Sequence, residues 1–304
     1  MHLYLPIAGL SVNILVIIGL GGVVGLLSGM FGVGGGFLTT PLLIFYGIPP
    51  AVAVASSAPQ LTGASVSGVL AHRQRGGVDV QMGSVLVAGG AIGAIFGGFI
   101  FQALQARGQI DMVVGMLYVV LLGGIGITMG REAIGSIVAS HTGAKPVVRT
   151  RRHHPLIASL PGRWRFYKSG LYISPLAPLM LGLATGMITA LMGIGGGFIL
   201  VPAMIYLLGM STRVVVGTSL FQILFVTIAT TMTHALTTHA VDIVLATLLL
   251  IGSVTGAQVG VRLAQKAKPE YLRLVLAFMV LTVAFRMALG LTWRPEEIYT
   301  VQPL

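Results

Sequence analysis

Long hydrophobic runs with few charges follow one another along almost the whole chain. They cover roughly 8–31, 36–46, 50–71, 82–105 and 111–130, and then 172–192, 197–208, 213–236, 242–264 and 271–291. Most of them reach the length of about 20 residues that a helix needs to cross a hydrocarbon core of about 30 Å. Only 8% of the residues are charged, against about 25% in a typical soluble domain. The pattern predicts an all-α membrane protein with about 8–10 membrane segments.

Two of the runs, 36–46 and 197–208, are too short to cross the membrane. At 1.5 Å per residue each covers about 15–18 Å, roughly half of the hydrocarbon core. Each follows a glycine-rich break, 32–36 (Gly-Val-Gly-Gly-Gly) or 193–197 (Gly-Ile-Gly-Gly-Gly), and contains a proline five residues after the last glycine. We expect a half-helix after each break, and we expect the breaks to line a cavity, because irregular backbone at this depth must be buried by protein or reached by water.

The two sets of runs are copies of one another. Counterparts 161 residues apart include Gly21 and Gly182, Gly25 and Gly186, Phe37 and Phe198, and Pro41 and Pro202; Ser57 and Ser219, Gln60 and Gln222, and His72 and His234 are 162 apart; Asp79 and Asp242 are 163 apart. The chain is therefore an internal repeat of five segments. Because five is odd, the second copy must enter the membrane from the opposite side, and the sequence predicts two inverted repeats, the common plan of secondary transporters.

Basic residues dominate the charge and gather between the two copies. The chain carries 18 Lys and Arg against 7 Asp and Glu. Eight of the basic residues lie in the linker 131–170, namely Arg131, Lys145, Arg149, Arg151, Arg152, Arg163, Arg165 and Lys168. Such a cluster is typical of a cytoplasmic loop, which argues against nucleic acid as a partner and places both termini outside the cytoplasm. The chain has no Cys, so disulfides and thiolate metal sites are excluded, and the sequence predicts neither a metal site nor a cofactor.

These boundaries predict an N-terminal repeat (1–130), a basic cytoplasmic linker (131–170), a C-terminal repeat (171–292) and a short tail (293–304). The N-terminus lacks the basic region of a signal peptide, so we expect the first run to remain in the mature protein. The Gly-rich stripes along the first helix of each copy indicate close helix packing.

The breaks are the first candidate site. Their glycines permit positive φ and close approach to a ligand, and the first N–H groups of a half-helix lack intrahelical partners and bind anions without a charged side chain. We assign substrate binding to the glycines Gly34, Gly35, Gly36, Gly195, Gly196 and Gly197. The alternative is that they only let helices cross or bend.

A polar stripe follows each half-helix. It comprises Ser56, Ser57 and Gln60 in the first copy, and Thr218, Ser219 and Gln222 in the second. Neutral hydrogen-bond donors suit the oxygens of a sulfonate or carboxylate. Interhelical hydrogen bonding is an equally good interpretation.

Three further residues are candidates for coupling or gating. His72 and His234 end the same helices and can carry a coupling proton near pH 7, although a satisfied interfacial histidine is the simpler interpretation. Arg286 lies inside the last run, where it either snorkels to the interface or attracts anions. Asp79 and Asp242 each open a helix, and we expect them to act as N-caps.

The breaks and the segment Val216-Gly217-Thr218-Ser219-Leu220-Phe221-Gln222 resemble the TauE/SafE family of sulfite exporters, over both halves of the chain. The resemblance implies a carrier in the cytoplasmic membrane that moves sulfite or an organosulfonate such as sulfoacetate without ATP, with export as the expected direction. No enzyme motif is present. A passive anion channel, an importer of another small organic anion, and a scaffold whose linker binds anionic lipid remain alternatives, and the oligomeric state stays open.

Overall fold

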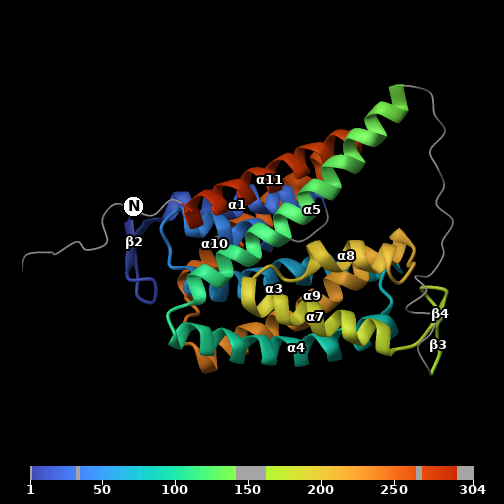
Figure 1. Ribbon diagram of the computed structural model, residues 1–304, viewed down its shortest axis with the longest axis horizontal. Coiled ribbons are helices and arrows are strands. Elements are labelled where there is room, and N and C mark those ends of the chain that lie inside the picture. Colours follow the sequence, from blue (N-terminus) through green and yellow to red (C-terminus); the bar gives the residue numbers. More distant parts are fainter. Residues whose placement is uncertain (1, 32–34, 75, 142–161, 265–268, 293–304) are drawn as a thin grey trace, which may run out of the picture.

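The computed structural model describes residues 2–31, 35–74, 76–141, 162–264 and 269–292, and most of them are helical. The first half holds α1 (Ile14–Phe31), α2 (Gly36–Phe45), α3 (Pro50–Gln74), α4 (Val80–Ala106) and α5 (Ile110–His141). The second holds α7 (Leu176–Met192), α8 (Gly197–Tyr206), α9 (Thr212–Thr237), α10 (Ile243–Ala264) and α11 (Pro269–Thr292). The helices run roughly along one common direction (Figure 1).

Five of the described helices, α4, α5, α9, α10 and α11, are long and apolar enough to cross a membrane. The helices α2 and α8 have 10 residues each, as expected for the two short runs. Their prolines, Pro41 and Pro202, lie inside the helices. The predicted helical membrane protein is therefore confirmed.

The two halves exchange helices when they pack. Helix α1 packs on α10, and its counterpart α7 packs on α4, whereas α3 pairs with α9 and α5 with α11. Figure 1 shows α3 and α9 in the middle of the molecule. Glycines in α1 and α4 let the backbones touch, because a Cβ at Gly25 of α1 would overlap the backbone of Ser253, and one at Gly93 of α4 would overlap that of Leu183.

Two β-hairpins, which the sequence analysis did not predict, precede α1 and α7. Strand β1 (His2–Leu5) pairs antiparallel with β2 (Leu10–Asn13), and β3 (Trp164–Phe166) pairs antiparallel with β4 (Leu171–Ile173). Each turn contains a glycine with positive φ, Gly9 at 66° and Gly170 at 65°, and these glycines are 161 residues apart. The repeat therefore begins before the first helix, and the hairpins lie at opposite ends of the molecule (Figure 1).

The hairpins change the boundaries of the predicted linker 131–170. Helix α5 continues to His141, and the hairpin β3–β4 occupies residues 164–173. Residues 142–161 lie outside the described part of the chain. The predicted tail 293–304 lies outside it as well.

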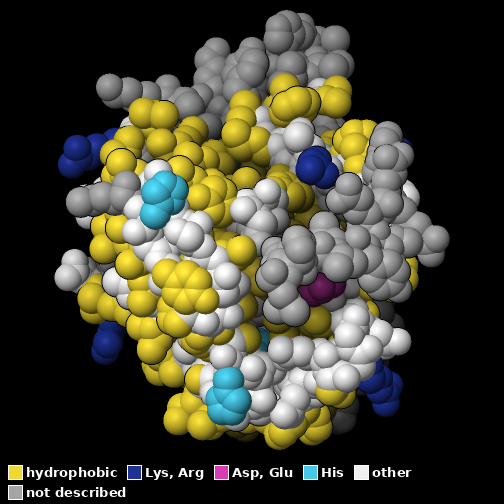
Figure 2. All heavy atoms as spheres, turned by 90° about the vertical axis from the view of Figure 1, so that its left-hand side faces the viewer, with side chains coloured by type: hydrophobic (Ala, Val, Ile, Leu, Met, Phe, Trp, Pro, Cys, Tyr) yellow, Lys and Arg dark blue, Asp and Glu magenta, His cyan; other side chains and the backbone are white. Residues whose placement is uncertain are grey.

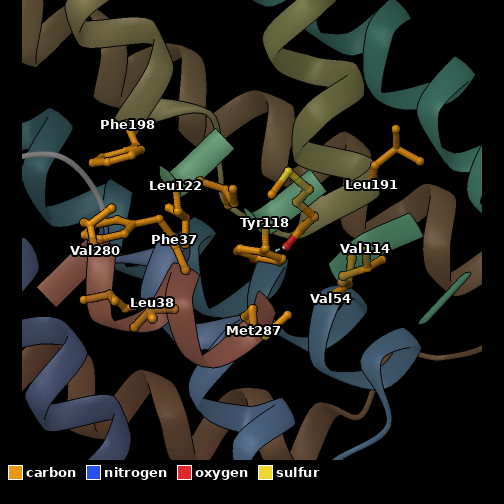
Figure 3. Close-up of a cluster of buried hydrophobic side chains, with 14 of the residues drawn as sticks. Phe37, Leu38, Val54, Val114, Tyr118, Leu122, Leu191, Phe198, Val280 and Met287 are labelled. Atoms are coloured by element: carbon orange, nitrogen blue, oxygen red, sulfur yellow. Dashed lines mark hydrogen bonds between the residues drawn. The ribbon is translucent and has the colours of Figure 1, made fainter. Parts of the chain in front are cut away.

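The largest hydrophobic cluster surrounds the two breaks. It contains Phe37 of α2, Phe198 of α8 and Tyr118 of α5, all of them fully buried (Figure 3). The core of the protein is thus built at the junction of the two halves.

Candidate functional site

The two glycine-rich breaks meet. Phe37 and Phe198, each the second residue of its half-helix, stack with ring centroids 4.6 Å apart and an interplanar angle of 13° (Figure 3). A Cβ at Gly36 would collide with the carbonyl group of Ile194 in the other break. The N-terminal turns of α2 and α8 therefore lie side by side.

The second break needs glycine for its backbone. Gly193, Gly195 and Gly196 have φ values of 71°, 75° and 72°, a region that disfavours other residues. Gly35 precedes α2 with φ −71°, and Gly34 lies outside the described residues. No side chain caps α2 at Gly35 or α8 at Gly196, so both half-helices keep the positive end of their dipole free of a side-chain acceptor.

The space between the breaks is filled by protein. The side chain of Leu61 lies against both Gly36 and Gly195 and is only 3% exposed. Gly195, Gly196 and Gly197 are buried. A ligand at this junction must displace Leu61, so the described conformation is closed at the breaks.

Ser57 lies against the opposite break. Its hydroxyl oxygen is 2.8 Å from that of Thr40, and a Cβ at Gly193 would come within 2.7 Å of it. Ser57 and its counterpart Ser219 both donate to the carbonyl three residues earlier in their own helix, at 3.1 Å to Val54 and 2.9 Å to Val216. The second copy lacks the hydroxyl–hydroxyl contact, because Val201 stands where the first copy has Thr40.

Ser56 and Thr218 connect helices. The backbone N–H of Asp242 donates to Oγ of Ser56, and that of Asp79 donates to Oγ1 of Thr218, each at 3.0 Å. These contacts match the interhelical interpretation of the polar stripe. They join α3 to α10 and α9 to α4 at equivalent places in the two halves.

The two glutamines are buried polar groups with unused hydrogen-bonding capacity. Gln60 and Gln222 are 1% and 0% exposed, and the Oε1 atom of each has no hydrogen-bond partner in the described part of the chain. Nε2 of Gln222 donates to Oγ1 of Thr185 at 3.4 Å. A buried amide without a full set of partners is costly, and rotating its terminal amide presents either a donor or an acceptor to a ligand.

The two histidines and Arg286 lie apart from the junction of the half-helices. His234 is buried, with Nε2 at 2.9 Å from the carbonyl of Ala190 and its ring edge-on to Phe101, so it is a satisfied histidine. His72 is partly buried in the last turn of α3, against Gly217. The guanidinium of Arg286 lies 5.4 Å from the centre of the Phe45 ring.

Several polar residues at the breaks escaped the sequence analysis. Tyr118 donates to the carbonyl of Met192 at 2.6 Å (Figure 3). Thr185 and Thr189 lie against Gly196, and Thr62 contacts Thr227 at 2.8 Å across the α3–α9 pair. The signal that could have found them is the presence of hydroxyls at helical spacing within otherwise apolar runs.

The predicted N-caps are confirmed, but their surroundings differ. Oδ1 of Asp79 accepts from the N–H of Met82, and Oδ1 of Asp242 accepts from that of Leu245, both at 3.1 Å. Oδ2 of Asp79 accepts from the backbone N–H of Ser169 at 2.9 Å and from its hydroxyl. Oδ2 of Asp242 is buried and has no partner among the described residues.

A cavity of about 440 Å³ lies next to Asp242 in sequence and in space. Its walls include Ile7 of the β1–β2 turn, Val241 and Ile243 on either side of the aspartate, and Pro59 beside Gln60. At the other hairpin, Nζ of Lys168, the counterpart of Ile7, donates to the carbonyl of Val78 at 3.3 Å. One hairpin is thus tied down by polar contacts, and the other borders a cavity.

Comparisons with known proteins agree with this architecture. Residues 17–287 match the family model described as "Sulfite exporter TauE/SafE". A probable membrane transporter protein of Xylella fastidiosa strain 9a5c is 28% identical over 276 residues, which cover 90% of this chain and 94% of the relative. The probable membrane transporter protein YjnA of Bacillus subtilis is 28% identical over 270 residues, covering 87% and 95%.

A further relative is a probable membrane transporter protein of Methanocaldococcus jannaschii, 24% identical over 282 residues, which cover 88% of this chain and 92% of the relative. No solved structure matches the chain significantly. Because the family model covers most of the chain, and the helices are those of a membrane protein, the chain belongs to the TauE/SafE family of membrane transporters.

Proposed function

We propose that the protein is a secondary transporter of a small sulfur-containing oxyanion, sulfite or an organosulfonate such as sulfoacetate, and that it exports this anion across the cytoplasmic membrane. The description of the matching family as sulfite exporters supports the substrate class and the direction. The observation that carries the proposal is the meeting of two uncapped half-helix N-termini at the Phe37–Phe198 stack.

The chemistry of this junction favours an anion. Hydrogen bonds to a charged group contribute about 1.5–3 kcal/mol each, so a few backbone N–H groups can hold an oxyanion and still release it. A fixed arginine in the middle of the membrane costs about 2.5–3.5 kcal/mol on the mildest scale. The buried amides of Gln60 and Gln222 add donors that carry no charge.

Alternating access is the mechanism that we infer. The exchange of helices between the halves, α1 on α10 and α7 on α4, and the hairpins at opposite ends (Figure 1) favour two inverted repeats that rock against each other. The basic linker then lies in the cytoplasm and both termini lie outside it. Binding at the breaks requires Leu61 to leave the space between Gly36 and Gly195.

Transport by purified protein in liposomes tests the site. We expect Gln60→Leu and Gln222→Leu each to raise the concentration of radiolabelled sulfite or sulfoacetate that half-saturates transport by about 10- to 100-fold. Each substitution removes one hydrogen bond to an anion. Gln81→Leu, a change at an exposed position of α4, is the matched control and should leave transport unchanged. If the Gln60→Leu/Gln222→Leu double variant half-saturates at the same substrate concentration as the wild type, the binding site does not lie at the breaks.

The same liposomes separate a carrier from the alternatives. A carrier shows faster uptake when unlabelled substrate is inside, whereas a passive channel shows unitary currents and no such stimulation. A gradient-driven preference for inward movement would replace export by import. If neither sulfite nor sulfoacetate moves, the substrate class is wrong.

A further inference from the structure

Asp242 differs from its counterpart Asp79 in what the uptake of a proton would disturb. Both oxygens of Asp79 accept hydrogen bonds, and a proton on Oδ2 would compete with the two donors of Ser169. Oδ2 of Asp242 is buried and accepts no hydrogen bond from the described part of the chain. Its other oxygen, Oδ1, makes the helix-capping bonds. Asp242 can therefore gain and lose a proton at Oδ2 without losing a hydrogen bond that the structure contains.

The cavity of about 440 Å³ provides a route from this aspartate to the β1–β2 end of the molecule. Its walls include Val241 and Ile243, the two chain neighbours of Asp242, and the exposed residue His239. Figure 2 views the molecule from this end, where lysine and arginine side chains are few and histidine side chains are exposed. Imidazole gains and loses protons between about pH 5 and 8, so His239 can pass protons between the surrounding water and the cavity.

His239 occupies a backbone position that suits glycine. Its φ is 51°, whereas every other described residue with positive φ is a glycine. Its counterpart 163 residues earlier, Gly76, has a φ of 68°. Left-handed backbone is unfavourable for residues with a Cβ, although less so for histidine than for most. Residues held in such conformations cluster at functional sites, and this one lines the cavity three residues before Asp242.

No lysine or arginine near Asp242 holds its carboxylate in the charged form. The elements packed around it contribute residues 2–31, 36–48, 50–71 and 234–261, and none of these is a lysine or an arginine. Besides Asp242 itself, the titratable groups of these segments are His2, Tyr4, Tyr46, His234 and His239. A change in the charge of Asp242 is therefore not balanced by a fixed cation.

We propose that Asp242 carries a proton that moves together with the transported anion, and that His239 exchanges this proton with the outside through the cavity. This inference rests on the proposed function and adds the coupling ion to it. In each transport cycle an O–H bond forms at Oδ2 and breaks again when the proton is released.

The position of Asp242 relative to Gln60 couples the proton to the anion. The backbone N–H of Asp242 donates to Ser56, which lies four residues before Gln60 on the same face of α3, or about 6 Å along the helix axis. A negative charge at Asp242 opposes an anion at Gln60, and a proton on Oδ2 removes that charge. The proton and the anion therefore favour each other's binding, and an outward gradient of the anion moves both out.

Infrared difference spectroscopy of the purified full chain, between acidic and alkaline buffer, tests the proton site without any substrate. We expect the wild type to show the carbonyl stretch of a carboxylic acid shielded from water, and Asp242→Asn to lose this band. Glu132→Gln, at an exposed position of α5, is the control and should keep it. A band that persists in Asp242→Asn, or no band in the wild type, would overturn the proposal. Thermal unfolding shows whether each variant is folded.

Liposomes that contain the protein and a pH-sensitive dye test the coupling. With the membrane potential clamped, we expect sulfoacetate that moves down its gradient to carry protons in the same direction, in the wild type and in Glu132→Gln. Asp242→Asn should still exchange labelled for unlabelled sulfoacetate but lose the proton movement. His239→Gly, which copies Gly76, should keep the exchange and slow the proton movement at least about tenfold, and added imidazole should restore it.

Each remaining outcome is decisive. Proton movement that is absent in the wild type, runs against the anion, or is unchanged in either variant would overturn the proposal. If the wild type moves no sulfoacetate and no sulfite, the proposed function is wrong, and the infrared band still decides whether Asp242 takes up a proton.

Discussion

Ser169 in the β3–β4 turn and Ala8 in the β1–β2 turn are counterparts 161 residues apart, and only Ser169 has a side-chain hydroxyl that can donate to a carboxylate. Ser169 donates both its backbone N–H and its hydroxyl to Asp79. The corresponding aspartate, Asp242, keeps a buried oxygen without a partner in the described chain. The two ends of the molecule thus share an architecture but differ in how firmly the hairpin is held.

The difference suggests what each hairpin does in an alternating-access carrier. The β3–β4 turn, held by Lys168 and Ser169, closes its end of the molecule. The β1–β2 turn borders a cavity that reaches Pro59, the neighbour of Gln60. The described conformation is then closed at the breaks and more accessible from the β1–β2 end, in agreement with the proposed function.

The largest expected effect separates the two aspartates. Asp79→Asn places an N–H₂ donor or a neutral oxygen opposite the two donors of Ser169. We expect the free energy of unfolding to fall by about 3 kcal/mol, because charge-assisted hydrogen bonds contribute about 1.5–3 kcal/mol each. Asp242→Asn retains the capping oxygen and removes a buried charge, so its stability should be unchanged or higher. The thermal unfolding midpoint in detergent measures both, and equal losses would contradict the comparison.

A smaller effect is expected for Ser169→Ala, which gives the β3–β4 turn the residue of the β1–β2 turn. The backbone N–H of residue 169 still reaches Asp79, so only the hydroxyl bond is lost. We expect a cost of about 1.5 kcal/mol, or a lowering of the unfolding midpoint by about 3 °C. In a protein that already carries Asp79→Asn, Ser169→Ala should lower the free energy of unfolding by a smaller amount, because the two side chains interact with each other.

The smallest effect is expected for the reverse change, Ala8→Ser. It offers a hydroxyl to the aspartate of the second half, and we expect a gain of at most about 1 kcal/mol. The matched control is Ser11→Ala, at an exposed position of β2, which should change the unfolding midpoint little. A midpoint lowered by Ala8→Ser would show that the two hairpin tips do not dock alike.

Much of this fold could be predicted from the sequence because membrane helices leave strong signals. Length and hydropathy identified the helices, and the repeated glycines and prolines at 36–41 and 197–202 identified the half-helices. The hairpins were not predicted. Strand β2 has only four residues and is followed directly by α1, so the sequence pattern does not separate the two. Strands this short carry no alternation long enough to stand out.

The candidate site was harder to predict. The spacing of Ser56 and Thr218 on a helix face could not tell a ligand contact from the bond to an aspartate N–H that the structure contains. Nor could it show that Leu61 fills the junction, since which side chain reaches between two breaks depends on how α3 crosses α9. Long-range packing of this kind is absent from local patterns.

The C-terminus of α7 adjoins the second break and therefore affects the electrostatic potential there. A broken helix sets the negative end of one segment beside the positive end of the next, which would cancel much of the attraction for an anion. Here three of the last four carbonyls of α7 already accept hydrogen bonds: that of Thr189 from the N–H of Gly193, that of Ala190 from His234 and that of Met192 from Tyr118. Because those carbonyls already accept hydrogen bonds, less of their negative potential opposes the positive N-terminal end of α8 at the second break.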